Sequence, residues 1–160
     1  MGSDKGIQQV LRQLQYGVYV ITMGSGEDGN AFTASWVSQV SSEPPMIAAS
    51  IHNKHQSARL LNQLDSYVVN LLPAEDIAIA KTYYGPAESG YEKLKAKDIS
   101  DSPVTKTPVL NGVVGYLEVR LTDRIKLGNH TLFVGEVVGG ERHSEKEILS
   151  TTNCQLHYTG

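Results

Sequence analysis

The stretch GSGEDGNAFTASWVSQVSSEPP, residues 24–45, decides between two folds. Its glycines at 24, 26 and 29 spell G-x-G-x-x-G, the pattern of a dinucleotide-binding turn, and they follow a strand-like run, YGVYVITM, at 16–23. In such a turn the third glycine begins a helix, whose N-terminus holds the pyrophosphate. The residues after Gly29 are instead rich in Thr, Ser and aromatic or β-branched types, and two prolines end them. The stretch therefore predicts a loose hairpin connection followed by a strand.

The rest of the chain predicts a mainly β protein with short helices. Apolar residues at helical spacing indicate helices at 7–14, about 56–64 and 75–83. Further strands are expected at 31–40, 46–51, 67–72, 113–125 and 131–138, with a hairpin turn at 127–130 and a last strand near 156–158. Strands and helices do not alternate regularly, so the pattern favours an antiparallel barrel with appended helices, in one domain over residues 1–160. Residues 85–106, rich in Gly, Pro, Ser, Asp and Lys, are expected to form a long surface excursion.

Composition excludes several classes of protein. The 160 residues are 40% hydrophobic and 19% charged, which is typical of a soluble globular domain. A net charge of -3 gives no general attraction to nucleic acid or to anionic lipid. No apolar run approaches the roughly 20 residues that span a bilayer, and the start of the chain lacks the apolar core of a signal peptide. With one cysteine, Cys154, and no internal disulfide, a cytoplasmic protein is expected, without nucleic-acid or membrane partners.

Two segments carry polar groups that could bind a flat, anionic ligand. In the predicted strand after Gly29, Thr33 and Ser35 could hydrogen-bond a planar heterocycle, although a half-solvated strand with hydroxyls facing water explains them as well. At 50–61 a strand passes through HNKH into a helix that Asn53 or Ser57 could cap, and Lys54 adds positive charge. Amides, hydroxyl and ammonium together would stabilise a phosphate monoester there, but an ordinary capped helix beside a solvated lysine is an equal alternative.

Other chemistry has less support in the sequence. His52 and His55 lie close along the chain, but no carboxylate or thiolate is near them, so no metal site is expected. His130 follows a hairpin turn, where it could approach a substrate or could be solvated. Cys154 has no evident base beside it and is interpreted as a small hydrophobic residue. The hydrolase and P-loop motifs are absent.

Taken in order, five segments resemble the flavin reductase-like, FMN-binding split-barrel family. They are YGVYVIT, FTASWVSQVSSEPP, AASIHNKHQS, YVVNLLPAED and GNHTLFVGEV, in a match that runs from about Leu11 to Val138. The first segment and the SSEPP turn are most similar to flavoredoxins and to the flavin reductase domains joined to rubredoxin. The resemblance implies an antiparallel split β-barrel that forms a homodimer, with a flavin site at each end of the interface.

The resemblance also implies the site residues. The flavin ring would lie along residues 32–36 and contact Thr33, Ala34, Ser35 and Trp36. The phosphate would lie at 52–57, where Asn53, Lys54 and Ser57 are the best candidates, next to Ser50, Ile51 and His52. The excursion would cover the flavin with Tyr91 and Lys93 nearest. His130 would be the catalytic residue, close to the flavin or the nicotinamide, although Asn129 replaces the acidic residue of the family's G-D-H-T segment.

The activity implied is that of an NAD(P)H-dependent flavin oxidoreductase. A nicotinamide dinucleotide would pass a hydride to FMN, or to FAD, and the electrons would go on to a second acceptor, such as a redox protein. The alternative is a flavoredoxin-type FMN electron-transfer protein that a protein partner reduces. A small barrel that binds some other ligand without redox chemistry is a third interpretation. The first two predict that flavin does the chemistry while the protein binds and orients it, which agrees with the lack of a nucleophile–base pair in the sequence.

Overall fold

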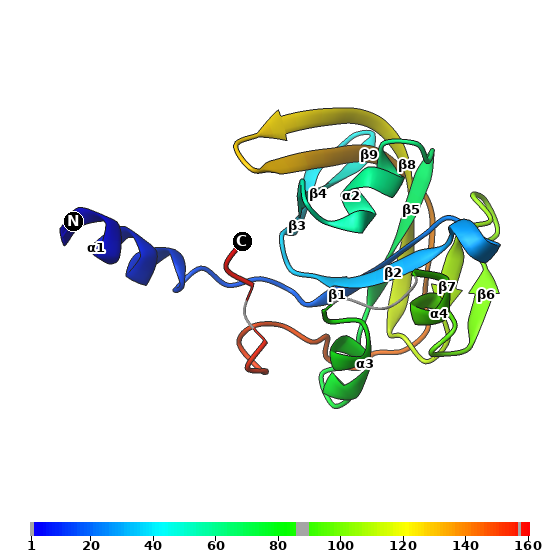
Figure 1. Cartoon of the computed structure of the whole chain (residues 1–160). Coiled ribbons are helices and arrows are strands. Elements are labelled where there is room, and N and C mark those ends of the chain that lie inside the picture. The colour runs from blue at the N-terminus through cyan, green and yellow to red at the C-terminus, as the bar shows by residue number, and fades with distance from the viewer. Residues whose placement is uncertain (1, 86–89, 157) are drawn as a thin grey trace.

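The computed structural model describes residues 2–85, 90–156 and 158–160, with side chains from residue 4 on (Figure 1). It is a mainly β structure with short helices. The helices are α1 (Gly2–Leu11), α2 (Gln56–Leu61), α3 (Ile77–Thr82) and α4 (Gly90–Leu94), with a 3-10 turn, η1, at Gly26–Asp28. The strands are β1 (Tyr19–Met23), β2 (Asn30–Ala34), β3 (Val37–Ser42), β4 (Pro45–His52), β5 (Ser66–Leu71), β6 (Ile99–Asp101), β7 (Pro108–Leu110), β8 (Gly115–Leu127) and β9 (His130–Arg142).

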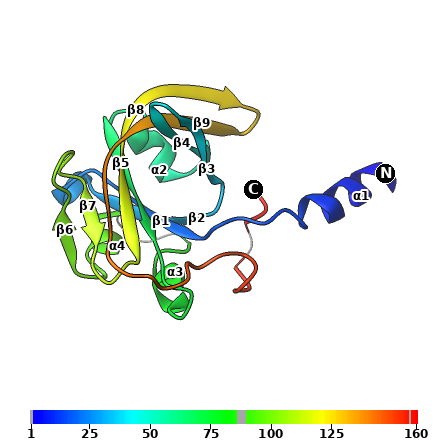
Figure 2. The ribbon, with the colours of Figure 1, turned by 180° about the vertical axis from the view of Figure 1, so that it is seen from behind.

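Seven strands form one curled antiparallel sheet. Their order is β2-β1-β5-β8-β9-β4-β3, so β2 and β3 are its two edges, while β6 and β7 form a separate pair. The long β8–β9 hairpin projects from the body in both views (Figures 1 and 2). The antiparallel, mainly β class predicted from the sequence is therefore confirmed.

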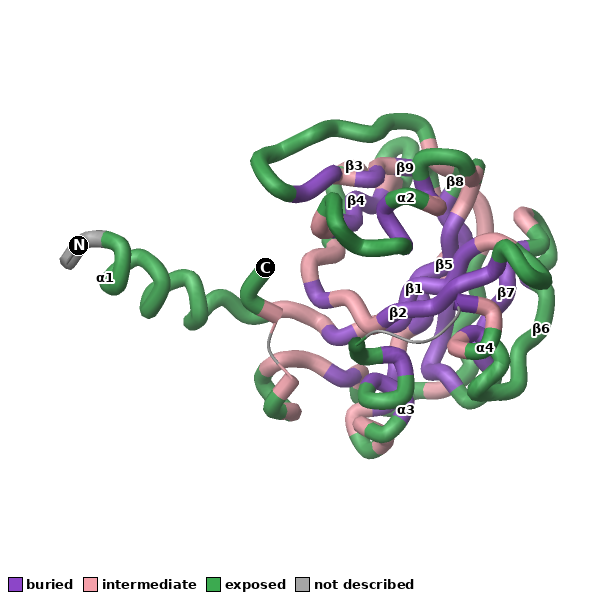
Figure 3. Tube along the Cα trace, viewed as in Figure 1, coloured by how far each residue is buried: buried purple, intermediate pink, exposed green. Residues whose placement is uncertain are grey.

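Two groups of buried residues hold the sheet together. One group includes Val18, Leu72 and Tyr83 and lies toward α3 and β7, and the other includes Ile21, Leu61 and Phe133 and lies under α2. Figure 3 shows the buried trace concentrated in the central strands, with the outer loops exposed. No helix in the described part of the chain has the length and apolar character needed to cross a membrane.

The glycine-rich stretch is a hairpin connection. β1 pairs with β2 in antiparallel register, from Tyr19 opposite Ala34 to Met23 opposite Asn30, and the chain crosses between them through η1. Gly24 has φ 65°, a left-handed conformation that favours glycine over residues with a side chain. A strand follows Gly29 where a dinucleotide fold would begin a helix, so the hairpin prediction is confirmed.

Several predicted boundaries are wrong. The strand expected at 31–40 is two strands. Where the chain turns from β2 to β3, the Val37 N–H donates to the Ser35 carbonyl at 3.0 Å. The first helix begins and ends earlier than residues 7–14, and the excursion at 85–106 contains α4 and β6. Leu156 and Tyr158 lie outside any strand, and the intervening His157 lies outside the described residues.

Helix α1 stands apart from the rest of the molecule in Figures 1 and 2. Its apolar side chains are exposed, with 55% of Ile7 and 69% of Val10 accessible to solvent. The amphipathic spacing that predicted a helix is present, but the apolar stripe has no covering surface in the described part of this single chain.

Candidate functional site

The break between β2 and β3 forms one wall of a narrow slot. The end of β4 lies beside this break, where the Ser50 N–H donates to the Trp36 carbonyl at 2.9 Å, and it also lines the slot. The slot has a volume of about 40 Å³ and is lined by Phe32, Thr33, Ala34, Ser35, Trp36, Ser50, Ile51, His52, His55 and Tyr158. Seven of the residues predicted to contact a flavin, Thr33 to Trp36 and Ser50 to His52, are thus brought together around one small space.

The polar groups of the slot differ in what they can offer a ligand. The Thr33 hydroxyl donates to the Ala80 carbonyl at 2.6 Å, so its proton is already used inside the protein. The Trp36 Nε1 atom is buried and has no hydrogen-bond partner among the described residues. Because burying an unpaired N–H costs free energy, this indole N–H is a candidate donor to an acceptor on a ligand.

A basic cavity of about 350 Å³ adjoins the slot, and His55 lines both. Its lining consists of Asn30, Lys54, His55, Gln56, Ser57, Gly85, Gly90 and Lys93. Ser57 is fully buried in the first turn of α2, and its hydroxyl oxygen accepts from Asn30 Nδ2 at 3.0 Å, which leaves the hydroxyl proton for another acceptor. The cavity therefore combines two ammonium groups with a buried hydroxyl donor, the chemistry that suits a phosphate.

The electrostatics of the basic cavity follow from its partial burial. Burial lowers the pKa of Lys93, whose Nζ donates to the Gly85 carbonyl at 2.7 Å. The pKa of His55 is lowered by burial and by the positive charges of Lys93 and His52. With His55 neutral, the positive charge that could bind an anion in this cavity would come from the ammonium groups of the lysines.

A second cavity, here called the tail cavity, lies on the other side of the slot. It has a volume of about 440 Å³, and its lining consists of Gln8, Leu11, Arg12, Tyr16, Trp36, Asn129, His130, Tyr158, Thr159 and Gly160. Trp36 and Tyr158 line both the slot and the tail cavity. The centroid of the Tyr158 ring lies 4.8 Å from that of Trp36 in an edge-on contact, so Tyr158 stands between the two spaces.

His130 is the buried titratable group of the tail cavity. It begins β9, opposite His52 on β4, and the two imidazole centroids are 5.0 Å apart. Its Nδ1 atom lies 2.7 Å from Asn129 Oδ1, and its Nε2 atom lies 3.0 Å from the Tyr158 hydroxyl. Burial, followed by the charge of His52, lowers the pKa of His130.

Not every predicted residue lines these three spaces. Asn53 is exposed, and its side-chain oxygen accepts from the Thr131 hydroxyl at 2.6 Å, which ties the turn before α2 to β9. The residue preceding α2 is His55, without a side-chain cap, so the prediction that Asn53 or Ser57 caps this helix is wrong. Tyr91 is outside the three linings and packs under the Lys95 ammonium, 4.2 Å from its ring centroid.

Sequence reasoning missed Asn30, His55 as a lining residue and Tyr158. Asn30 directly follows the glycine turn, and a polar amide at the start of a strand-forming run is a signal that could have been used. Tyr158 gave no signal beyond being aromatic. Among the described residues, no cluster of three or more His, Cys, Asp or Glu side chains is arranged to hold a metal ion.

Comparison with known proteins gives the family. The sequence model of the "Flavin reductase like domain" family matches residues 11–159, which is nearly the whole chain. The matched range includes every residue that lines the slot and the two cavities, except Gln8 and Gly160. The chain belongs to the flavin reductase-like domain family. The resemblance recognised from five sequence segments is thereby confirmed.

Similar proteins of this family carry several names. An NADH:FMN oxidoreductase of Rhodococcus erythropolis is 30% identical over 150 residues, which is 94% of this chain and 76% of that protein. An NADPH-flavin oxidoreductase of Streptomyces viridifaciens is 29% identical over 94% of this chain and 78% of its own length. A high molecular weight rubredoxin of Moorella thermoacetica is 28% identical over 81% of this chain, but only 57% of that protein is covered.

Solved structures share the fold of this flavin reductase-like domain. BorF, the flavin reductase component of a bacterial two-component tryptophan halogenase, superposes with a TM-score of 0.82 at 24% identity and covers 92% of both chains. The NADH:FAD oxidoreductase SgcE6 of Streptomyces globisporus C-1027, in complex with NAD and FAD fragments, superposes with a TM-score of 0.81 at 24% identity. That match covers 91% of this chain and 88% of the other.

Proposed function

We propose that the protein is an NAD(P)H-dependent flavin oxidoreductase that uses FMN and delivers electrons to a second acceptor. The observation that carries the proposal is the order of three adjoining spaces, from the basic cavity through the slot to the tail cavity. FMN has the same order, a phosphate at one end and a flat ring at the other. The tail cavity beside the slot would give a hydride donor access to a face of the ring. The relatives named NADH:FMN oxidoreductase and NADPH-flavin oxidoreductase support the same activity.

The basic cavity fits the phosphate of FMN. Lys54 and Lys93 would supply the positive charge, and the hydroxyl of Ser57 would donate to a phosphate oxygen. FMN is proposed over FAD because its phosphate is a monoester with the higher negative charge, which two ammonium groups and a buried donor match. Asn53 would act indirectly, through the contact with Thr131 that fixes the turn before α2.

The slot fits the polar edge of a flavin ring. The unpaired Trp36 N–H would donate to an acceptor on that edge, while Ala34, Ser35 and Ile51 would flank the ring. Tyr158 lines this space of about 40 Å³, so its side chain would have to leave before a flavin ring enters. Bound flavin would supply the redox chemistry, and the residues of this chain would bind the ring, orient it and exclude water.

An anaerobic visible spectrum tests the proposal. Purified protein is mixed with FMN, and NADPH and then NADH are added without oxygen. The proposal expects the flavin band to bleach within seconds after one addition, followed by re-oxidation when an acceptor such as a ferric chelate is supplied. No flavin binding, or no nucleotide oxidation with added FMN, would refute it.

An electron-transfer protein of the flavoredoxin type is the second candidate. The likeness to part of a high molecular weight rubredoxin favours it, because that name indicates an electron-transfer protein. It predicts tightly bound FMN that neither nicotinamide bleaches and that a reduced iron–sulfur protein bleaches rapidly. Fast reduction by NADPH or NADH alone would exclude this second candidate.

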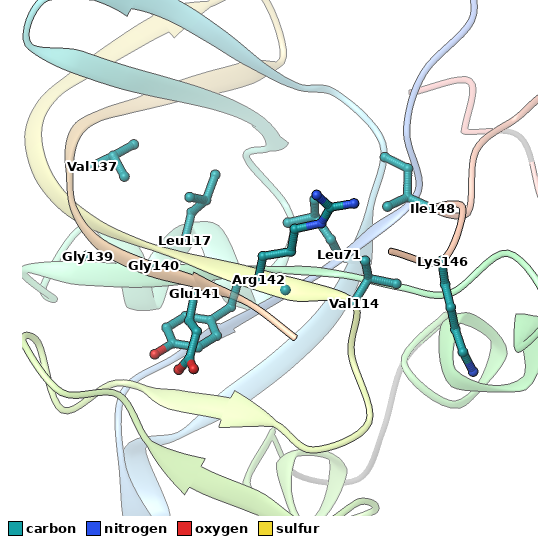
Figure 4. Close-up of a pocket in the computed structure, with 12 residues that line it drawn as sticks. Leu71, Val114, Leu117, Val137, Gly139, Gly140, Glu141, Arg142, Lys146 and Ile148 are labelled. Atoms are coloured by element: carbon teal, nitrogen blue, oxygen red, sulfur yellow. The ribbon is translucent and has the colours of Figure 1, made fainter. Parts of the chain in front are cut away.

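We also propose a single split-barrel domain that pairs with a second copy of itself. An apolar groove of about 650 Å³ crosses β8, β9 and the end of β5, with Leu71, Leu117 and Val137 among its lining residues (Figure 4). Leu71 and Leu117 also line a neighbouring hollow with Tyr19 and Val37, so a half-buried apolar band continues from the groove into this hollow. Light scattering should give the mass of a dimer, and Leu117→Glu should give that of a monomer. A monomeric wild type would refute the dimer.

The cytoplasmic location expected from the composition stays a prediction. It agrees with a lone cysteine, Cys154, and with a chain whose proposed activity needs reduced nicotinamide. Cell fractionation with an antibody to the protein would test it, and recovery with the membranes would contradict it.

A further inference from the structure

The hydrogen bonds of His130 define which of its nitrogens carries a proton. An amide oxygen can only accept, and Asn129 Oδ1 lies 2.7 Å from Nδ1, so Nδ1 must be the donor in this contact. Nε2 lies 3.0 Å from the Tyr158 hydroxyl. In a neutral imidazole with its proton on Nδ1, the Nε2 atom is an acceptor, and the Tyr158 hydroxyl therefore donates to it.

The surroundings of His130 favour the neutral ring. His52 faces it from β4 at 5.0 Å between ring centroids, and Tyr158, near the C-terminus, faces it as well. Arg12 and Tyr16 also line the tail cavity. No Asp or Glu side chain of the described residues lines this cavity. Burial and the neighbouring positive charge both disfavour the imidazolium, in agreement with the lowered pKa of His130.

We propose that Asn129 is a positioning residue that fixes the proton of His130 on Nδ1, so that Nε2 is presented as an acceptor for the carboxamide N–H of a nicotinamide. A carboxylate at position 129 would stabilise an imidazolium, which donates at both nitrogens and accepts at neither. The neutral amide of Asn129 accepts from Nδ1 and leaves Nε2 as an acceptor.

Tyr158 occupies the position that we expect the nicotinamide carboxamide to take. Its hydroxyl occupies the position from which a hydrogen bond reaches Nε2, between the slot and the tail cavity. A nicotinamide ring next to a flavin in the slot would carry its carboxamide toward the same nitrogen once Tyr158 has moved aside. This part of the inference rests on the proposed function, whereas the role of Asn129 in fixing the proton does not.

The first test uses the protein without flavin or nucleotide. Long-range ¹H–¹⁵N correlation spectra distinguish the two neutral tautomers of histidine, and His130→Gln assigns the signal. We expect His130 protonated at Nδ1 and titrating below the ordinary histidine range. In Asn129→Asp its pKa should rise by about 1 unit or more, since a carboxylate would replace the amide beside Nδ1. The matched control, Asn62→Asp on the exposed end of α2, should leave it unchanged.

A proton on Nε2 in the wild type, or a His130 pKa that Asn129→Asp does not move, would overturn the proposal. Neither result depends on whether the protein reduces flavin.

The second test addresses the ligand. The reduced 3-acetylpyridine analogue of the dinucleotide has an acetyl group in place of the carboxamide and so lacks the N–H donor. The comparison is made at a pH between the His130 pKa values that the first test finds for wild type and Asn129→Asp. There we expect the ratio of kcat/KM for nicotinamide over acetylpyridine to fall about tenfold from wild type to Asn129→Asp, as loss of one hydrogen-bond preference implies. Measuring the change in the ratio cancels the intrinsic difference between the two donors.

The outcomes separate the inference from the proposed function. If neither nucleotide reduces flavin, the proposed function fails and the magnetic resonance result alone decides the role of Asn129. If both reduce flavin and the ratio is the same in wild type, Asn129→Asp and Asn62→Asp, the carboxamide assignment is wrong while the proposed function stands.

Discussion

Replacing Lys93 by methionine should weaken binding of FMN and leave binding of riboflavin unchanged. Lys93 lies on α4, is half-buried, and lines the basic cavity together with the fully buried Ser57. Its Nζ already donates to the Gly85 carbonyl at 2.7 Å, which holds the ammonium at the cavity wall. Methionine keeps most of the length and apolar stem of the side chain and removes only the charge and its protons.

The magnitude follows from the kind of bond that is lost. A hydrogen bond to a charged group contributes about 1.5–3 kcal/mol, and the partial exposure of Lys93 places it at the low end of this range. About 1.4 kcal/mol corresponds to a tenfold change in Kd, so FMN should bind roughly tenfold more weakly. Lys54 is exposed, so Lys54→Met should cost only about two- to fivefold. Riboflavin has no phosphate and should show neither loss.

Titration of flavin fluorescence against wild type and each variant measures these constants, with Lys81→Met on the exposed side of α3 as a control that should change neither ligand. The pH dependence adds a second readout. Because burial lowers the pKa of Lys93, its charge is lost at a lower pH than that of an exposed lysine. FMN affinity in the wild type should therefore fall as the pH rises through that value, and Lys93→Met should lack this step. Equal losses for FMN and riboflavin would refute the reasoning.

Three further predictions concern the site and the sheet. His130→Ala should lower the rate constant for reduction of bound flavin, measured by stopped flow, more than it weakens flavin binding. An unchanged rate constant would show that this histidine takes no part in the reaction. Glu118 is buried, and although burial alone would raise its pKa, hydrogen bonds from Thr105 and its neighbours lower it on balance. Its contribution to stability is thus present above the ordinary carboxyl range and lost as the pH falls through the lowered value. Glu118→Gln should cost about 1–3 kcal/mol in urea unfolding at pH 7 and flatten this acid limb, and unchanged unfolding would contradict it. In Gly135→Ala the new Cβ would lie 2.4 Å from the Arg120 carbonyl oxygen, which is too close. The melting temperature should therefore drop by several degrees, corresponding to about 1–3 kcal/mol. An unchanged melting temperature would count against the β8–β9 register.

The features that the sequence predicts well are those that local patterns determine. The hairpin between β1 and β2 follows from strand-forming residues on both sides of a glycine turn. Lys54 and Ser57, which line the basic cavity, lie within one short segment of the sequence. The break at Ser35 was not predictable, because the alternation of apolar and polar residues continues across it. The break depends on β4, whose Ser50 binds the Trp36 carbonyl from outside the segment.

Contacts from distant parts of the chain also determine the surroundings of Asn53 and Tyr158. Asn53 is well placed along the chain to bind an anion, yet its side chain is held by Thr131, which is 78 residues away in the sequence. Tyr158 reaches His130 across 28 residues and gives no periodic signal of its own. Contacts between distant segments decide which polar groups remain available to a ligand, and one sequence without its fold does not reveal them.

The separation of α1 from the body of the molecule has a consequence for hydrogen exchange. A helix of 10 residues whose Ile7 and Val10 are uncovered is close to the limit at which isolated helices are stable in water. Its amides should therefore exchange with solvent within the dead time of a manual experiment. The amides of β5 and of the buried first part of β8, residues 115–119, should exchange only on global unfolding. Protection of residues 5–11 is therefore a direct indicator that a second surface has covered Ile7 and Val10, and its dependence on protein concentration separates a second copy of the chain from any other partner.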